Sequence, residues 1–138
     1  GDTHAGQVAF PGGHLELKEC ACDAALREAN EEVGLDPEDV VVVGALPDIV
    51  SIHTVRVTPI FAVAAQSPRL RADNLEVARV FDIAWSDLVG GVGYRRGAWR
   101  GHRMHYWDLE GETLWGLTGA MVYRLIERLE GRGPEEAP

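Results

Sequence analysis

The apolar and polar positions change periodicity along the chain, and these changes predict alternating helices and strands. Ala, Leu and Glu dominate Glu19–Val33, and the following Gly34 is the residue type that most often ends a helix. A second helix is expected between Thr118, as its N-cap, and Glu130, because apolar residues recur there at helical spacing. A short helical turn is expected at Ser86–Val89.

Runs of β-branched and other apolar residues predict the strands, which proline and glycine separate. In chain order the strands are Gln7–Phe10, Val40–Leu46, Thr54–Ala65, Glu76–Ala84 and Arg103–Leu109, the last an edge strand that pairs with Thr113–Trp115 as a hairpin. Residues 131–138 offer little to bury, so we expect one domain over residues 1–130 and a flexible tail after it. This order of elements predicts an α/β fold with antiparallel character.

The composition is that of a globular protein, with 138 residues, 46% of them hydrophobic and 25% charged. No stretch approaches the roughly 18 apolar residues of a membrane helix, so no membrane partner is expected. The 22 acidic residues exceed the 13 Lys and Arg, and the net charge of −9 is unsuited to binding nucleic acid. A phosphorylated substrate of so acidic a protein would have to meet a divalent cation.

The sequence contains two cysteines, Cys20 and Cys22, which are too few for a disulfide framework. No second Cys or His pair lies at the spacing of a zinc site. We therefore expect reduced thiols and a location in the cytoplasm or an organelle matrix. The chain does not begin with Met, so its first residues are expected to result from processing, tagging or truncation.

Three glutamates crowd one side of the first predicted helix. At about 100° per residue, Glu28, Glu31 and Glu32 fall within an arc of roughly 100°. Carboxylates so close repel one another, and Arg27, four residues before Glu31, can neutralise only part of their charge. Because Mg²⁺ binds oxygen ligands and bridges to phosphate, this face predicts a divalent metal site. The alternative is an acidic face that is merely solvated.

The segment Gly13–Leu35 matches a known spacing at every fixed position. The spacing is Gly, five residues, Glu, seven residues, Arg-Glu, an aliphatic residue, any residue, Glu-Glu, any residue, Gly and an aliphatic residue, with Ala29 in the first aliphatic position. The segment resembles the Nudix box. This resemblance implies an α/β/α sandwich with a mixed sheet and a catalytic loop–helix–loop. It also implies hydrolysis of a nucleoside diphosphate linked to another moiety, with Mg²⁺ or Mn²⁺ as cofactor.

The same resemblance assigns roles to individual residues. It implies that three glutamates bind the metal and orient or deprotonate the water: Glu28, Glu31 and Glu32. It also implies that the backbone carbonyl of Gly12 is a further metal ligand. It implies that Arg27 steadies the glutamates and that Glu19 is a supporting acid. Many members add a glutamate from a later loop, for which Glu76 is the candidate. The alternative for Glu76 is an ordinary residue at the start of a strand.

Three further segments are similar to the coenzyme A pyrophosphatase subfamily of Nudix enzymes. They are residues 4–13, with Gly, three residues and Phe-Pro-Gly-Gly, and residues 76–81 and 114–118. The similarity implies hydrolysis of coenzyme A or its thioesters to 3′,5′-ADP and 4′-phosphopantetheine, with substrate contacts at His4, Gln7 and Phe10. In the basic stretch 93–105, Arg95 and Arg96 could meet the 3′-phosphate, and the alternative is a solvated loop.

Two other functions stay open at this level. One is hydrolysis of ADP-ribose, FAD or a related nucleoside diphosphate derivative, and the other is a non-catalytic Nudix-fold regulator that binds a nucleotide. The subfamily pattern extends upstream and has Arg where this chain has Asp2, so we expect the domain to lack strands that precede residue 1. A partner chain could supply such a strand, which predicts a homodimer.

Overall fold

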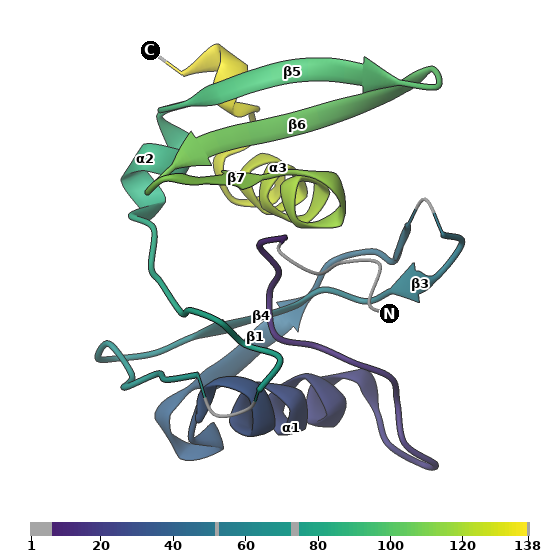
Figure 1. The fold of residues 1–138 in the computed structure, drawn as a ribbon, viewed down its shortest axis with the longest axis vertical. Coiled ribbons are helices and arrows are strands. Elements are labelled where there is room, and N and C mark those ends of the chain that lie inside the picture. The colour runs from purple at the N-terminus through teal and green to yellow at the C-terminus, as the bar shows by residue number, and fades with distance from the viewer. Residues whose placement is uncertain (1–6, 52, 73–74, 138) are drawn as a thin grey trace. The chain divides into compact units, whose positions relative to one another are not determined.

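In the computed structural model, which describes residues 7–51, 53–72 and 75–137, the chain divides into two units (Figure 1). The acidic-helix unit comprises Pro11–Asp48 and Thr58–Asp82. The hairpin unit comprises Gly1–Phe10, Ile49–Val57 and Ile83–Pro138. Each unit has its own strands and its own long helix, and each is therefore described by itself.

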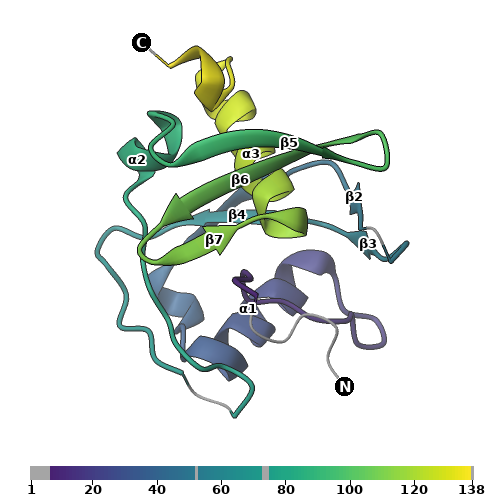
Figure 2. The ribbon, with the colours of Figure 1, turned by 45° about the horizontal axis from the view of Figure 1, so that its top comes forward.

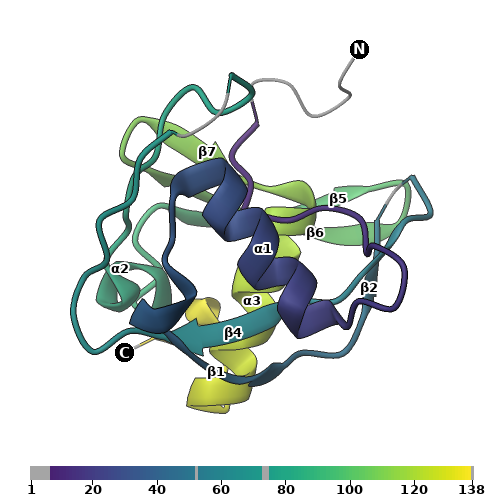
Figure 3. The ribbon, with the colours of Figure 1, turned by 90° about the horizontal axis from the view of Figure 1, so that it is seen from below.

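The acidic-helix unit pairs one long helix with a two-stranded sheet. Its elements are helix α1 (Ala21–Val33), the 3₁₀ turn η1 (Pro37–Asp39), and strands β1 (Val41–Ala45) and β4 (Ile60–Val63). The two strands are antiparallel, with a bulge between Val42 and Gly44, and α1 packs against β4 (Figure 3). The helix ends at Gly34, which adopts a left-handed conformation with φ 69°, as the sequence predicts.

The hairpin unit is a three-stranded antiparallel meander packed against a helix. Its elements are β2 (Ile49–Val50), β3 (Arg56–Val57), α2 (Trp85–Val89), β5 (Tyr94–Trp99), β6 (His102–Leu109), β7 (Glu112–Leu114), α3 (Gly116–Glu130) and the 3₁₀ turn η2 (Pro134–Glu136). Strand β6 is central and contacts α3 (Figure 2), while β2 and β3 form a separate antiparallel pair.

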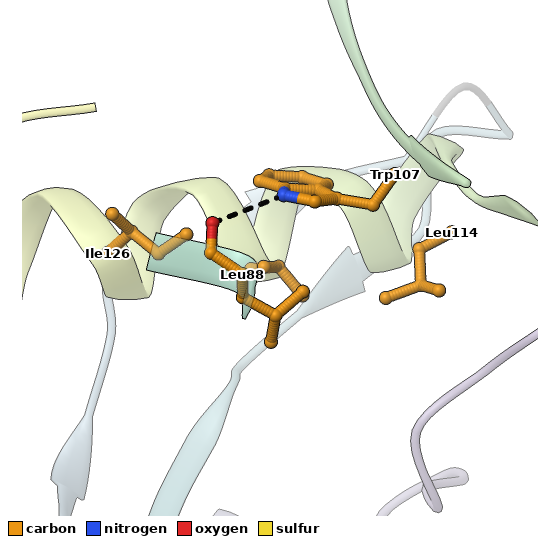
Figure 4. Packing of buried hydrophobic residues seen from close by; sticks show 5 residues of the cluster. Leu88, Trp107, Leu114 and Ile126 are labelled. Carbon is orange, nitrogen blue, oxygen red and sulfur yellow. Dashed lines mark hydrogen bonds between the residues drawn. The ribbon is translucent and has the colours of Figure 1, made fainter. Parts of the chain in front are cut away.

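The core of the hairpin unit lies between the meander, α2 and α3. Trp107 and Ile126 are fully buried, and Leu88, Leu114 and Val122 complete the cluster (Figure 4). The indole Nε1 of Trp107 donates to the carbonyl of Leu88 at 3.3 Å, so the one polar atom of this side chain is satisfied.

Several predicted elements are confirmed, and two predicted strands are wrong. Strand β1 lies within the predicted segment Val40–Leu46, and α2 covers the predicted turn Ser86–Val89 and begins one residue earlier, at Trp85. Gln7–Phe10 is not a strand, and the carbonyl of Val8 accepts a hydrogen bond from the side chain of Thr118. Glu76–Ala84 is also irregular. Its half-buried residues before position 82 are residues 77, 80 and 81, and this spacing lacks the alternation of buried and exposed residues that a half-buried strand shows.

Three other expectations need correction in detail. The run Thr54–Ala65 is divided into β3 and β4, since a proline such as Pro59 cannot donate to a ladder. Strand β6 is central, not an edge, because Tyr94–Trp99 pairs with its other side. All strand pairs of the described residues are antiparallel, so they contain no parallel member of a mixed sheet.

The C-terminal helix and the residues after it also differ from expectation. Helix α3 begins at Gly116, two residues before Thr118, and Thr118 is not the N-cap but a buried residue within the helix. Residues 131–137, expected as a flexible tail, include η2, with Pro134 buried. The hydroxyl of Tyr123 on α3 donates to Glu135 Oε1 at 2.6 Å, so a hydrogen bond links this turn to the helix.

Candidate active site

Helix α1 buries its small apolar residues and leaves its carboxylates accessible. Ala24, Ala29 and Val33 are buried, whereas Glu28 and Glu32 are half-buried and Glu31 is exposed. The helix therefore has one apolar side, which is buried. Packing of this side fixes the helix and, with it, the backbone positions of the three glutamates.

Arg27 lies at the centre of the acidic cluster and contacts four carboxylates. Its guanidinium donates to both oxygens of Glu19, from Nε at 2.8 Å and from Nη2 at 2.9 Å. Its Nη1 lies 2.9 Å from Glu28, 3.4 Å from Glu31 and 3.5 Å from Glu16. One guanidinium therefore links the loop that precedes α1 to two of the helix carboxylates.

One further hydrogen bond ties the loop before α1 to the helix, and another lies within the loop. Arg27 Nη2 donates to the carbonyl of His14 at 3.1 Å, and the N–H of Glu16 donates to Glu19 Oε1 at 2.9 Å. The hydrogen bond from Arg27, followed by that from Glu16, lowers the pKa of Glu19 to about 2. The bond to Glu19 in turn raises the pKa of Arg27, so the pair is ionised at neutral pH.

Two glycines place the loop backbone directly against the helix carboxylates. A Cβ at Gly13 would lie 2.5 Å from Cδ of Glu28, far closer than real Cβ contacts. The backbone N–H of Gly12 donates to the carboxylate of Glu32. These contacts give the two glycines a specific steric and hydrogen-bonding role in the loop.

Glu32 lies in an environment that disfavours its charge. Burial is the largest cause, followed by a hydrogen bond with Glu28, and together they raise the pKa of Glu32 to about 7 despite the N–H of Gly12. The negative charges of Glu28 and Glu76 act in the same direction. Glu76 is an exposed residue of the irregular segment that follows β4, and its charge reaches Glu32 although 44 residues separate the two in sequence.

Crowded, partly desolvated carboxylates beside a glycine-rich loop are the arrangement that the Nudix box implies. The model of the NUDIX domain matches residues 1–89 of the chain. The chain belongs to the Nudix family.

Curated relatives support the same family. A protein of Pectobacterium atrosepticum named "Uncharacterized Nudix hydrolase NudL" is 35% identical over 135 residues, which are 94% of this chain and 70% of the relative. Proteins of the same name from Citrobacter koseri and Escherichia coli K12 are 38% and 37% identical over 130 residues, or 88% of this chain. This chain spans 66% of the length of each of these two relatives.

Family membership confirms the interpretation of the segment 13–35 as a Nudix box, and it shows the class of reaction. The chain is a Nudix pyrophosphohydrolase, an enzyme that acts on small-molecule nucleotides, and enzymes of this family generally use divalent metal ions. The coenzyme A subfamily is not distinguished by the names of these relatives. No helix in the described part of the chain is long and apolar enough to cross a membrane.

The carboxylate oxygens on α1 are suitable ligands for a divalent cation, although the side chains do not converge on one point. Among residues 7–51, 53–72 and 75–137, no three His, Cys, Asp or Glu side chains form a ready metal-binding group. Glu31, 54% exposed, is turned towards Arg27, while Glu28 and Glu32 hydrogen-bond to each other. A divalent cation would relieve the repulsion that raises the pKa of Glu32, and oxygen donors are those that Mg²⁺ prefers.

The structure brings together some of the predicted site residues and leaves others apart. The acidic-helix unit contains Gly12, Arg27, the three glutamates of α1 and Glu76. Gln7 and Phe10 belong to the hairpin unit, where Phe10 is exposed, and His4 lies outside the described residues. Within the same unit, the basic stretch 93–105 is a hairpin and not a solvated loop.

The two arginines predicted as phosphate contacts lie on opposite faces of β5. Arg95 donates to Asp108 at 3.0 Å and stacks on Tyr106, with its guanidinium carbon 4.3 Å from the ring centroid. Arg96 pairs in register with His105, on the face that packs towards α3. Sequence reasoning missed Glu16 as a partner of Arg27, since an exposed loop glutamate carries no periodic signal.

Proposed function

We propose that this Nudix hydrolase cleaves the diphosphate of coenzyme A or its derivatives to 3′,5′-ADP and 4′-phosphopantetheine or its acyl form. The observation that carries the proposal is the Phe-Pro-Gly-Gly stretch at residues 10–13, which resembles the coenzyme A subfamily and leads directly to the glycines beside Glu28 and Glu32.

The other two segments with this resemblance also have defined environments. Thr118, in the segment 114–118, donates its hydroxyl to the carbonyl of Val8 at 2.8 Å, so it contacts the stretch that precedes the box. Glu76, the first residue of the segment 76–81, acts electrostatically on Glu32. Within its own unit, each of these two segments therefore acts on a residue in the box or in the stretch before it.

We assign the metal site to Glu28, Glu31, Glu32 and the backbone carbonyl of Gly12, with Mg²⁺ or Mn²⁺ as the cation. A cation held there would neutralise the diphosphate and lower the pKa of a bound water. The protein's own contribution is to hold the carboxylates in place through Arg27 and Glu19, whose ion pair includes contacts of 2.8 and 2.9 Å.

A glutamate takes the proton of the attacking water in this proposal. Glu32 is one candidate for this task because it is half-buried beside Glu28 and the backbone of Gly12, where its carboxylate is held in place. Glu76 is the second candidate, since its charge already acts on Glu32. Gln7, Phe10 and Arg96 are the described residues that we assign to substrate contacts.

The test compares hydrolysis of coenzyme A, ADP-ribose, NADH and FAD with Mg²⁺ or Mn²⁺, with products separated by chromatography. Release of 3′,5′-ADP from coenzyme A in clear preference to cleavage of the other three is the expected result. Cleavage of ADP-ribose or FAD in preference would retain the metal site and overturn the substrate assignment. Absence of hydrolysis of all four would overturn the proposed activity of this chain.

A matched pair of variants separates an enzyme from a nucleotide-binding regulator. Glu32→Gln is expected to reduce turnover about 100-fold or more, as loss of a general base or metal ligand does. Glu38→Gln changes the net charge equally at an exposed position of η1 and should leave turnover unchanged. If Glu32→Gln and Glu38→Gln have the same turnover, the assignment of Glu32 is wrong.

A further inference from the structure

A second charged cluster lies in the hairpin unit, where the inner face of β5 and β6 carries two arginines. Arg96 is directly opposite His105, and Arg103 is opposite Ala98 on the same face of the pair. Neither guanidinium forms a hydrogen bond or ion pair with any described residue. Both arginines are exposed, and their charges act on His105 and Tyr94. This face therefore holds two guanidiniums whose hydrogen bonds are not used by any described residue.

Beside these arginines, three rings form a half-buried stack. The ring of His105 lies parallel to that of Tyr123 on α3, with centroids 3.7 Å apart. Its Nδ1 is 2.7 Å from the hydroxyl of Tyr94. Burial lowers the pKa of His105, so the ring is neutral at pH 7 and retains an N–H that can donate. The stack fixes the orientation of the His105 imidazole and of the Tyr94 and Tyr123 hydroxyls, so these groups are preorganised for a ligand.

The carboxylate of Glu135 already lies among these groups. It accepts the hydrogen bond of the Tyr123 hydroxyl at 2.6 Å, and it interacts electrostatically with Arg96 and His105. Glu135 belongs to η2, in which Pro134 is buried and Gly91 approaches the Pro134 carbonyl closely. Glu127 on α3 also acts electrostatically on Tyr123. Of these two carboxylates, Glu135 is the one hydrogen-bonded within the cluster, beside an imidazole and two guanidiniums that form no hydrogen bond or ion pair with any described residue.

A phosphate monoester matches this cluster better than one carboxylate does. At neutral pH it carries between one and two negative charges and three acceptor oxygens. Guanidinium groups bind such oxygens in pairs, and the hydroxyl of Tyr123 and the imidazole can donate to the remainder. We propose that Arg96, Arg103, His105 and Tyr123 form a binding site for a phosphate monoester group, which Glu135 occupies as an internal competitor.

This inference rests in part on the proposed function, which assigns Arg96 to substrate contacts, and deepens it. The binding test itself does not require coenzyme A as substrate. The group could come from free inorganic phosphate or from a nucleotide such as 3′,5′-ADP. The test is therefore a binding measurement by calorimetry with each of these two ligands, on the full chain. A chelator in the buffer removes divalent cations, and the ionic strength is held constant so that electrostatic screening is the same in every measurement. No hydrolysis is measured, so failure of the coenzyme A assignment would leave the result interpretable.

Two pairs of variants with equal changes of charge make the test specific. Glu135→Gln is expected to tighten phosphate binding about fivefold because it removes the competing charge, while Glu136→Gln on the same turn should not change it. Arg96→Gln should weaken binding about tenfold, as loss of a charge-assisted hydrogen bond does, and Arg124→Gln on α3 should not. Circular dichroism would verify that each variant is folded.

A spectroscopic signature distinguishes this site from general attraction of anions. Phosphate bound beside His105 should raise the pKa of its imidazole, which NMR titration of that ring measures. Binding of 3′,5′-ADP with the same dependence on Arg96 identifies a nucleotide phosphate, and binding of inorganic phosphate alone identifies a free anion. The proposal is overturned if Glu135→Gln binds neither ligand at millimolar concentration, or if Arg96→Gln and Arg124→Gln bind equally well.

Discussion

Arg27 and Glu19 form a two-point ion pair that spans the start of helix α1, with Nε–Oε2 and Nη2–Oε1 distances of 2.8 and 2.9 Å. Glu19 lies before the helix and Arg27 lies in its second turn, so the pair fixes the direction in which the chain enters α1. The same guanidinium contacts Glu28 at 2.9 Å. The position of Glu19 therefore affects, through Arg27, the position of the Glu28 carboxylate, which we assign as a metal ligand.

The ion pair predicts a specific dependence of stability on pH. The pKa of Glu19 is lowered from 4.5 to about 2, first by its hydrogen bond with Arg27. Because the pKa is lower in the folded state, its contribution to stability is fully present above pH 4.5 and is lost as the pH falls towards 2. Urea unfolding of Glu19→Gln should show lower stability than the unmodified protein at pH 7, with a difference that shrinks in this window.

Glu16→Gln is the matched control for this experiment. The Glu16 carboxylate lies 3.5 Å from the same guanidinium and is 67% exposed, so its loss should change stability far less. If Glu16→Gln and Glu19→Gln lower the urea midpoint equally at pH 7, the two-point geometry has no special importance.

The contact between Gly13 and Glu28 predicts a defect that is larger in activity than in stability. A Cβ at position 13 meets the end of the Glu28 side chain, which must move, and Arg27 opposes that movement. Gly13→Ala should cost about 1 kcal/mol of unfolding free energy, as overpacking does. Turnover should fall about tenfold or more, because displacement of a metal ligand weakens transition-state stabilisation.

Gly12→Ala tests the steric part of this explanation. Nothing lies within 4 Å of a Cβ built at Gly12, so its unfolding free energy should stay within about 0.5 kcal/mol of the unmodified protein. Equal destabilisation by alanine at both positions would show that the Glu28 contact does not determine the cost.

The acidic helix could be predicted from sequence because its determinants are local. The helix, its glycine stop and the placement of Glu28, Glu31 and Glu32 all follow from a period of 3.6 residues and from the residue type at position 34. The close approach of Gly13 to Glu28 depends on how the loop folds back, and no periodicity records such a tertiary contact.

The hairpin unit was harder to predict for an equally physical reason. Strand β5 has Arg96 on its inner face between Tyr94 and Ala98, so this face does not show the alternating apolar pattern that identifies a half-buried strand. Thr118 has the side chain of an N-cap, yet its hydroxyl binds the carbonyl of Val8, 110 residues away in sequence. For both β5 and Thr118, contacts with other segments of the chain determine the structure.

Lys18 predicts a stabilising substitution. This exposed residue has a left-handed backbone with φ 64°, which costs a side-chain-bearing residue about 1 kcal/mol or more. Glycine adopts the conformation without the clash but loses more entropy on folding, so Lys18→Gly should raise the unfolding free energy by about 0.5 kcal/mol. Lys18→Ala keeps the Cβ and should give no gain. A gain of equal size in both variants would attribute the effect to the lysine charge.

The hydrogen bond between Thr118 and Val8 predicts how firmly the stretch before the box is held. The donor is buried in α3, and the 2.8 Å bond is formed with the carbonyl of Val8. Thr118→Val preserves the volume but removes the donor, which should cost about 1 kcal/mol and increase local opening about fivefold. Hydrogen exchange of the backbone amides at residues 7–10 measures that opening directly. Thr118→Ser keeps the hydroxyl and should retain slow exchange, although it loses a buried methyl group. Rapid exchange in Thr118→Ser, or unchanged exchange in Thr118→Val, would show that packing of the stretch and not this bond holds it.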